Sequence, residues 1–355
     1  MHEEALISCL KSLYEGAGFR AYKMRKFEEY SLYLENRDFL LSDFVITFSD
    51  MSGRLLALKP DVTLSIVKGS RATKETGEKV YYLENVYRLD ERTHEYREIR
   101  QMGLEALGEI DTVQTVEIMY LALNTLNKLH ERSVMDVAHM GCVQYFLKGA
   151  DKKAQSEILN ALRIKSARAL GIALENADIK EGSKQALMKI NALSGDAEEA
   201  IETLKTLGDD QDYRLIVQEI EDIFVSLKNL GMDKNVRIDF SIANDLNYYT
   251  GIVFQGYVPF AHRAVLSGGR YDGLSQKFLR GVGALGFALY LSDLENTSSP
   301  AYQADALIVY KKGTSADKVL ACAKELRDKG LSVRIEADGC SRDKYAIVKE
   351  VGFEC

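Results

Sequence analysis

A carboxylate and a hydroxyl two residues apart follow a predicted strand in the segment Leu-Lys-Pro-Asp-Val-Thr, residues 58–63. Asp61 and Thr63 together could accept hydrogen bonds from an ammonium group. The simpler interpretation is a helix cap, in which Pro60 and Asp61 lead into a helix over 63–68 and the Asp61 carboxylate accepts hydrogen bonds from its first N–H groups. Taken alone, this pattern favours the cap.

A carboxamide and a carboxylate share one face of a predicted strand over residues 97–107. Because alternate residues of a strand point the same way, Gln101 and Glu105 lie on one face, with Gly103 between them. A glycine at that place would leave room for a small polar ligand. A solvent-exposed face with alternating polar residues explains the pattern equally well, so both interpretations stay open.

Two further segments combine tyrosines with glycines. Tyr248 and Tyr249 precede Thr-Gly, and Gly268-Gly269-Arg270 precedes Tyr271. A tyrosine can direct its hydroxyl into a pocket while its ring packs in a core, and paired glycines let the backbone approach a ligand closely. Aromatic packing and an ordinary turn are the alternatives.

The order and content of these segments resemble the catalytic core of histidyl-tRNA synthetase, a class II aminoacyl-tRNA synthetase, over roughly residues 1–295. Residues 58–63 are similar to the family's L-R-P-E-x-T, and 87–108 to class II motif 2. Residues 245–251 and the segment GGRYDGL at 268–274 resemble its two histidine-specific motifs, and 283–294 stand where motif 3 is expected.

The resemblance implies a histidine pocket without a metal or cofactor. In it Asp61, Thr63 and Gln101 would hold the α-ammonium group, and Glu105 would accept the imidazole N–H. Arg88 would face the carboxylate or an adjoining phosphate, and three tyrosines would close the pocket. The pocket residues that it assigns are Asp61, Thr63, Arg88, Gln101, Glu105, Tyr248, Tyr249 and Tyr271, with the backbone of Gly268 and Gly269.

Three positions depart from the family where adenylation needs arginines. Asn244 replaces the arginine that precedes the first histidine motif, Asp293 replaces the arginine that ends motif 3, and Glu95 replaces one of motif 2. A unit charge 4 Å away is worth about 4 kcal/mol at an effective dielectric constant of 20. Two acids beside a triphosphate would therefore oppose ATP binding, and we expect a site that keeps histidine and has lost adenylation.

A histidine pocket without adenylation resembles the regulatory-subunit family of ATP phosphoribosyltransferase, a non-catalytic paralogue of histidyl-tRNA synthetase. The resemblance implies a synthetase-like homodimer within a hetero-octamer with the short-form catalytic subunit. It implies that the chain activates this subunit in the first step of histidine biosynthesis and takes part in feedback inhibition by L-histidine. A divergent histidyl-tRNA synthetase and a sensor of another amino acid remain the alternatives.

Composition supports a globular chain with a large core. The 355 residues are 46% hydrophobic, and the formal net charge is −7. This charge argues against nucleic-acid binding by the whole chain, because phosphate binding needs a basic face. The five cysteines contain no C-x-x-C pair, which indicates neither a disulfide framework nor a zinc site. With no signal peptide and no bilayer-spanning stretch, we expect a cytoplasmic protein.

Periodicity predicts the elements that must position these residues. Strands are expected near 79–89, 97–107, 133–139, 236–258 and 283–290, and a hairpin over 44–58. They indicate an α+β fold with the mostly antiparallel sheet of a class II synthetase, flanked by helices. The expected organisation is residues 1–142 and 234–298 as two parts of this core, 143–233 as a helical insert, and 301–355 as a truncated α/β tail like an anticodon-binding domain. The tail carries ten basic and nine acidic residues, so no tRNA binding is expected.

Overall fold

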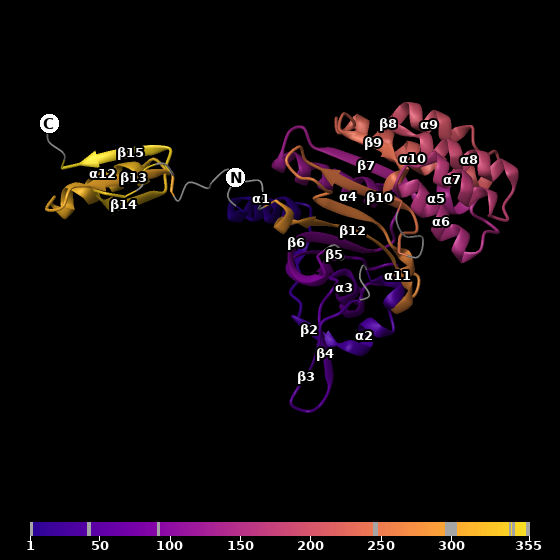
Figure 1. Ribbon diagram of the computed structural model, residues 1–355, viewed down its shortest axis with the longest axis horizontal. Helices are drawn as coiled ribbons and strands as arrows, with labels where there is room; N and C mark the ends of the chain where they lie inside the picture. Colours follow the sequence, from indigo (N-terminus) through magenta and orange to yellow (C-terminus); the bar gives the residue numbers. More distant parts are fainter. Residues whose placement is uncertain are drawn as a thin grey trace. The chain divides into compact units, whose positions relative to one another are not determined.

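The computed structural model describes residues 3–40, 44–90, 93–243, 248–294, 304–340, 342 and 345–352. The chain divides into two compact units, Met1–Leu294 and Glu295–Cys355. The first unit is built on a twisted sheet with helices on both faces (Figure 1). This arrangement confirms the predicted α+β fold.

The large sheet has nine strands in the described residues, and most neighbours are antiparallel. Only β1–β5 and β7–β9 pair in parallel within this sheet. The strands in spatial order are β1 (Arg20–Ala21), β5 (Glu78–Asp90), β6 (Glu95–Gly108), β12 (Gly283–Tyr290), β11 (Leu266–Arg270), β10 (Ile252–Tyr257), β7 (Val134–His139), β9 (Val236–Asp239) and β8 (Ser194–Asp196).

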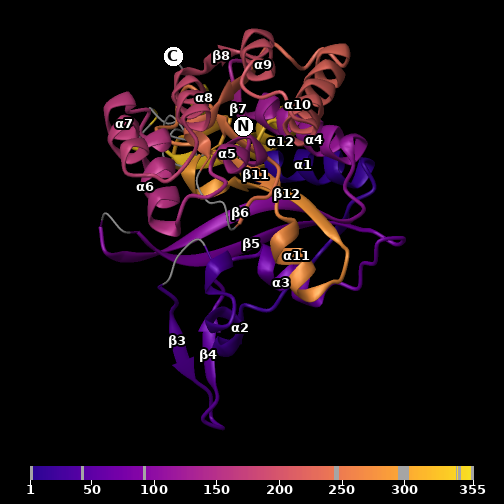
Figure 2. The ribbon, with the colours of Figure 1, turned by 90° about the vertical axis from the view of Figure 1, so that its right-hand side faces the viewer.

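Helices cover both faces of the large sheet, and the polar residues of β6 lie on only one of these faces. Helices α1 (Glu3–Gly16) and α4 (Thr112–Leu129) pack on one face, and α3 (Thr63–Gly69) and α11 (Asp272–Phe278) lie on the other (Figure 2). On β6, Met102, Leu104 and Ala106 are buried in the cluster with α1 and α4. Alternation along the strand therefore turns Gln101, Gly103 and Glu105 toward α3 and α11.

The residues Asp111 and Gln114 form a D-x-x-Q pattern, which predicts a capped helix start at Asp111, and helix α4 begins there. The Asp111 side chain accepts hydrogen bonds from the backbone N–H groups of Val113 and Gln114, at 2.7 and 3.1 Å. These bonds satisfy two donors that have no partner inside the helix. The cap thus fixes where the chain leaves β6 and crosses the sheet.

The segment between β7 and β9 is mostly helical and packs around an apolar cluster of its own. This cluster also contains Ala138 of β7 and Val253 of β10, which join it to the sheet. One expectation was wrong here, because Ser194–Asp196 forms β8, a short strand antiparallel to β9 that helical periodicity did not indicate. The helices are α5 (Met140–Phe146), α6 (Lys152–Arg163), α7 (Ala167–Glu175), α8 (Glu181–Ala192), α9 (Ala197–Lys205) and α10 (Gln211–Asn229).

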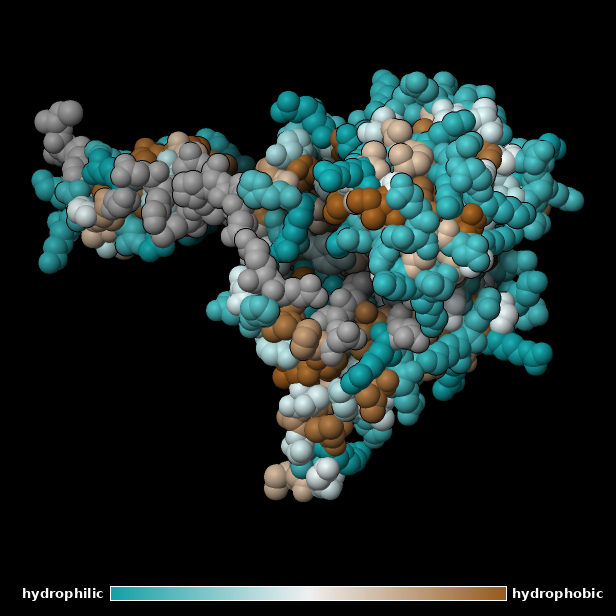
Figure 3. Space-filling model, turned by 45° about the vertical axis from the view of Figure 1, so that its right-hand side comes forward, coloured by the Kyte–Doolittle hydropathy of each residue, from teal (hydrophilic) through white to brown (hydrophobic). Residues whose placement is uncertain are grey.

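A small three-stranded sheet forms the lower lobe of this unit and contains the predicted hairpin. It consists of β2 (Phe27–Glu29), β4 (Leu55–Leu58) and β3 (Thr47–Ser49), beside α2 (Tyr30–Leu34). The half-exposed rings of Phe27 and Phe48 meet edge to face at 5.5 Å. Hydrophobic side chains gather over this lobe in Figure 3.

The second unit has a parallel three-stranded sheet in the order β14-β13-β15. It is formed by β13 (Ala306–Tyr310), α12 (Ala316–Asp328), β14 (Val333–Ala337) and β15 (Ile347–Val351). Sequence periodicity predicts a strand over 305–310, a helix over 315–329 and a strand over 332–336, followed by a weaker helix and a strand. β13, α12 and β14 agree with the first three, and between β14 and β15 the described residues contain no helix. In neither unit is a described helix long and apolar enough to cross a bilayer.

Candidate functional site

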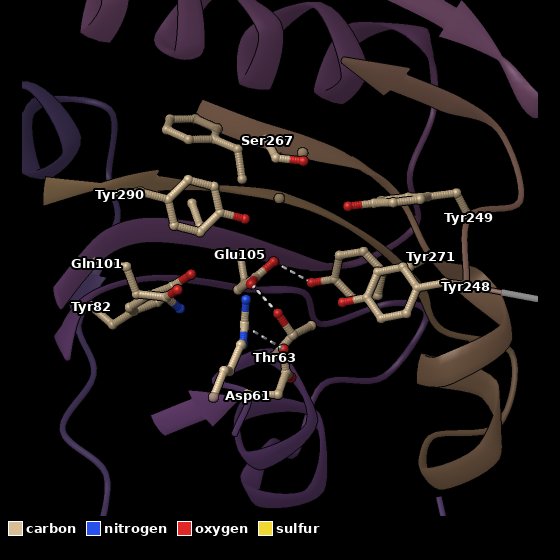
Figure 4. Close-up of a pocket in the computed structure, with 15 residues that line it drawn as sticks. Asp61, Thr63, Tyr82, Gln101, Glu105, Tyr248, Tyr249, Ser267, Tyr271 and Tyr290 are labelled. Atoms are coloured by element: carbon tan, nitrogen blue, oxygen red, sulfur yellow. Dashed lines mark hydrogen bonds and ion pairs between the residues drawn. The ribbon is translucent and has the colours of Figure 1, made fainter. Parts of the chain in front are cut away.

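A pocket opens on the face of the large sheet that carries α3 and α11 (Figure 4). Together with the open solvent at its mouth, it contains about 380 Å³ of space that no protein atom fills. Nine of the ten residues assigned to a site from the sequence line it. These nine are Asp61, Thr63, Arg88, Gln101, Glu105, Tyr248, Tyr249, Gly268 and Tyr271.

Glu105 of β6 is the buried carboxylate of the pocket. Its side chain accepts hydrogen bonds from Thr63 Oγ1, at 2.8 Å, and from the Tyr271 hydroxyl. Burial raises the pKa of Glu105 to about 8, although both hydroxyl donors act to lower it. The Thr63 hydroxyl and the Tyr271 hydroxyl thus both donate to Glu105.

Asp61 makes the predicted helix cap and also faces the pocket. Its Oδ1 accepts a hydrogen bond from the backbone N–H of Leu64 at 2.8 Å, and its Oδ2 lies 3.7 Å from Nη2 of Arg88. Arg88 is held in turn by its Nε, which donates to the carbonyl oxygen of Pro60 at 2.7 Å. Burial raises the pKa of Asp61, opposed chiefly by Arg88. The two interpretations of this carboxylate are thus compatible, one for each oxygen.

Gln101 presents an unused acceptor to the pocket. Its side chain is 2% exposed, and its Oε1 has no hydrogen-bond partner among the described residues. A buried acceptor without a partner costs about 1–3 kcal/mol. A ligand N–H group would remove this cost.

The expectation that Gly103 leaves room for a ligand was wrong. Tyr82 stands directly across from it on β5, and an added Cβ at Gly103 would lie 2.5 Å from the Tyr82 hydroxyl. The space above Gly103 is therefore filled by a tyrosine of the neighbouring strand. The pocket lies between this tyrosine and the other lining residues.

Three tyrosines form one wall. The ring of Tyr248 lies 4.7 Å from that of Tyr249 and 5.9 Å from that of Tyr271. Gly269 is the one assigned residue that does not line the pocket, because it packs against the Tyr249 ring. A Cβ atom added at Gly269 would lie 2.7 Å from carbon atoms of that ring. The departure noted at Asn244 and the adjoining Asp245 lie outside the described residues.

Six lining residues were not assigned to the pocket from the sequence, and strand pairing places three of them opposite residues of β6. Tyr82 lies opposite Gly103, Tyr290 opposite Gln101, and Gly286 opposite Glu105. Pairing of this kind depends on the register between strands far apart in sequence. The six are Tyr82, Ser267, Gly286, Phe287, Ala288 and Tyr290.

The charges of the pocket suit a small zwitterion. Within the described lining, Arg88 is the sole cation, the two carboxyl groups are Asp61 and Glu105, and Arg88 pairs with Asp61. Asp293 forms an ion pair with Arg263, and Ser292 Oγ accepts a hydrogen bond from the backbone N–H of Arg100 at 2.9 Å. These motif 3 positions thus add no positive charge. No cluster of metal-ligating side chains was found in the described part of the chain.

Comparisons with known proteins agree with the resemblance seen in the motifs. The family model described as histidyl-tRNA synthetase matches residues 1–294. A relative from Oceanobacillus iheyensis is 27% identical over 90% of this chain and 80% of its own length. One from Moorella thermoacetica is 29% identical over 97% and 89%. Both are named ATP phosphoribosyltransferase regulatory subunit.

Solved structures share the fold. A Bacillus halodurans protein described as an ATP phosphoribosyltransferase regulatory subunit/histidyl-tRNA synthetase has a TM-score of 0.77 at 22% identity, covering 98% of this chain and 93% of its own. A chain of the Thermotoga maritima complex described as ATP phosphoribosyl transferase (HisG:HisZ) has a TM-score of 0.65 at 19% identity, covering 82% and 97%. The chain therefore belongs to the histidyl-tRNA synthetase family, and its curated relatives include proteins named ATP phosphoribosyltransferase regulatory subunit.

Proposed function

We propose that this chain is the histidine-binding regulatory subunit of ATP phosphoribosyltransferase. It has no catalysis of its own, activates a short-form catalytic subunit and mediates inhibition by L-histidine. The names of its relatives support this role. The fold that it shares with a chain of a transferase complex is consistent with such a partner.

The observation that supports L-histidine as the ligand is a pocket lined by several buried hydrogen-bond acceptors and one cation. Gln101 Oε1 and the Asp61 carboxylate suit an α-ammonium group, and Arg88 suits a carboxylate. Glu105 suits an imidazole N–H, which needs an acceptor fixed in direction; Thr63 and Tyr271 orient it. L-histidine supplies all three groups at once.

Loss of adenylation is part of the proposal. A nucleoside triphosphate carries several negative charges, and enzymes that transfer a phosphoryl or nucleotidyl group from it bind these charges with several cations. The described lining offers one guanidinium and two carboxylates. Asp293 does not line the described pocket and is bound to Arg263, so it gives an incoming phosphate no cation.

The assembly and the absence of tRNA binding are also proposed. We expect synthetase-like homodimers within a hetero-octamer in the cytoplasm. The helical segment 143–233 carries 12 basic and 16 acidic residues, and the tail is nearly neutral. Neither offers the excess of positive charge that phosphate backbones require.

The direct test measures the formation of phosphoribosyl-ATP from ATP and phosphoribosyl pyrophosphate by the short catalytic subunit of the same organism. Adding this chain is expected to raise the rate about tenfold or more, and L-histidine to reverse the rise, within the range of typical allosteric coupling. The catalytic subunit with an equal amount of an unrelated protein is the control. Absence of stimulation together with absence of co-elution would reject the proposal.

A second expected result concerns the chain alone. It should show no histidine-dependent exchange between ATP and pyrophosphate, because the described pocket offers the triphosphate of ATP only one cation, Arg88. A catalytically active histidyl-tRNA synthetase at the same concentration serves as the positive control. Exchange above background would favour the divergent synthetase instead.

A further inference from the structure

An ion-paired cluster outside the pocket joins the helical segment to the strand that delivers Tyr271. It contains Glu219 of α10, Arg270 at the end of β11, and His139 at the end of β7. None of the three lines the pocket. Their side chains are 30%, 25% and 4% exposed, so the cluster is mostly shielded from solvent.

Glu219 is placed between the other two. Its Oε2 lies 3.4 Å from Nε2 of His139, and its Oε1 lies 3.9 Å from Nη1 of Arg270. His139 Nδ1 accepts a hydrogen bond from the backbone N–H of Gly141 at 3.1 Å, so the neutral imidazole carries its proton on Nε2, toward Glu219. The nearby His139 lowers the pKa of Glu219 most, Arg270 adds to this effect, and burial opposes both.

Arg270 connects this cluster by hydrogen bonds to both segments that supply tyrosines to the pocket, residues 248–251 and 271–272. Its Nε donates to Oδ2 of Asp272 at 2.8 Å, so the guanidinium spans Tyr271. Its carbonyl oxygen accepts from the backbone N–H of Thr250 at 2.9 Å, close to Tyr248 and Tyr249. The Thr250 hydroxyl oxygen accepts in turn from the backbone N–H of Asp272 at 3.2 Å.

We propose that Glu219 is a positioning residue for the ligand pocket, acting through Arg270 to hold Tyr271 and residues 248–251 in their binding arrangement. This rests on the proposed function only for the identity of the ligand, L-histidine. The helical segment 143–233 thereby influences the affinity of the pocket for its ligand, although it contributes no residue to the described lining. A shift of α10 and occupation of the pocket are then coupled, and by linkage each alters the other.

Glu219→Gln in the full chain tests the proposal. Glutamine keeps the shape and an oxygen that accepts from His139, and it removes the charge that attracts Arg270. We expect L-histidine to bind about fivefold more weakly or worse in calorimetric titration, at an unchanged melting temperature. Glu221→Gln is the matched control, because Glu221 lies on the same helix and pairs with Lys205.

Two further measurements separate a positioning role from general loosening. In a double-mutant cycle, Glu219→Gln should add little to Arg270→Gln, since both remove the same link. In the ligand-free chain, hydrogen exchange of the Thr250 amide should be faster in Glu219→Gln than in Glu221→Gln. Equal affinity of Glu219→Gln and the native chain, additive effects, or unchanged exchange would each overturn the proposal. If the native chain binds no L-histidine, the proposed ligand fails, and the exchange measurement still decides the role of Glu219.

Discussion

Glu105→Gln is expected to lower the affinity for L-histidine by about 10- to 100-fold, because a hydrogen bond to a charged group is worth about 1.5–3 kcal/mol. The glutamine has the same shape and retains one acceptor oxygen, so the tyrosine wall should remain in place. What it loses is the carboxyl group, which becomes a charged acceptor for the imidazole N–H when it releases its proton on binding. The substitution is therefore expected to weaken ligand binding without disturbing the tyrosine wall.

The same substitution is expected to stabilise the empty chain at alkaline pH. Glu105 has a pKa of about 8 when folded, against an ordinary value of 4.5. Between these values the folded chain holds a proton that the unfolded chain has released, so the free energy of unfolding falls as pH rises from about 4.5 to about 8. The span corresponds to about 5 kcal/mol at most, and glutamine removes it.

Urea unfolding at pH 5, 6, 7 and 8, with calorimetric titration of L-histidine at pH 7, measures both effects. Glu98→Gln is the control, because Glu98 lies on the same strand but is exposed. It should change neither affinity nor the pH profile. Unchanged histidine affinity in Glu105→Gln would show that the ligand lies elsewhere, and an unchanged pH profile would show that this carboxyl does not hold its proton.

Gly286→Ala should lower the free energy of unfolding by about 3 kcal/mol or more, with loss of ligand binding. An added Cβ would lie 1.8 Å from Oε2 of Glu105 and 2.3 Å from the carbonyl oxygen of Leu104. The Glu105 side chain is held by Thr63 and Tyr271, and the Leu104 carbonyl belongs to the sheet, so neither yields without cost. Urea unfolding and histidine titration check this prediction.

Gly171→Ala supplies the matched control. Gly171 lies inside α7, and nothing is within 4 Å of its added Cβ. Alanine there should stabilise the chain by about 0.5–1 kcal/mol, the ordinary gain from glycine to alanine in a helix. If Gly286→Ala were as stable as the native chain, the close packing of Glu105 against β12 would be refuted.

Local signals in the sequence predicted much of the fold. The alternation around Gln101 and Glu105 indicated the right strand and put both residues on one face. The Asp111 cap marked the start of α4 correctly. The three residues of β8 were missed because so short a strand has no period of its own and exists through its pairing with β9.

The pocket was predicted only in the part that motifs carry. Asp61 and Glu105 stand in segments whose residue order is informative in itself. Tyr82 and Tyr290 are brought in by the register of β5 and β12 against β6, which is set by distant packing. For this reason the space over Gly103 was assigned to a ligand when a tyrosine fills it.

The wall formed by Gly268 and Gly286 has a consequence for how this pocket evolves. At both positions an added Cβ would meet backbone oxygen within 2.5 Å, so this part of the surface is main chain and has no side chain to exchange. Mutation cannot reshape it in small steps. A change of ligand preference in descendants of this chain must therefore arise at replaceable side chains such as Ser267 and Tyr290, while the main-chain wall of the pocket stays the same.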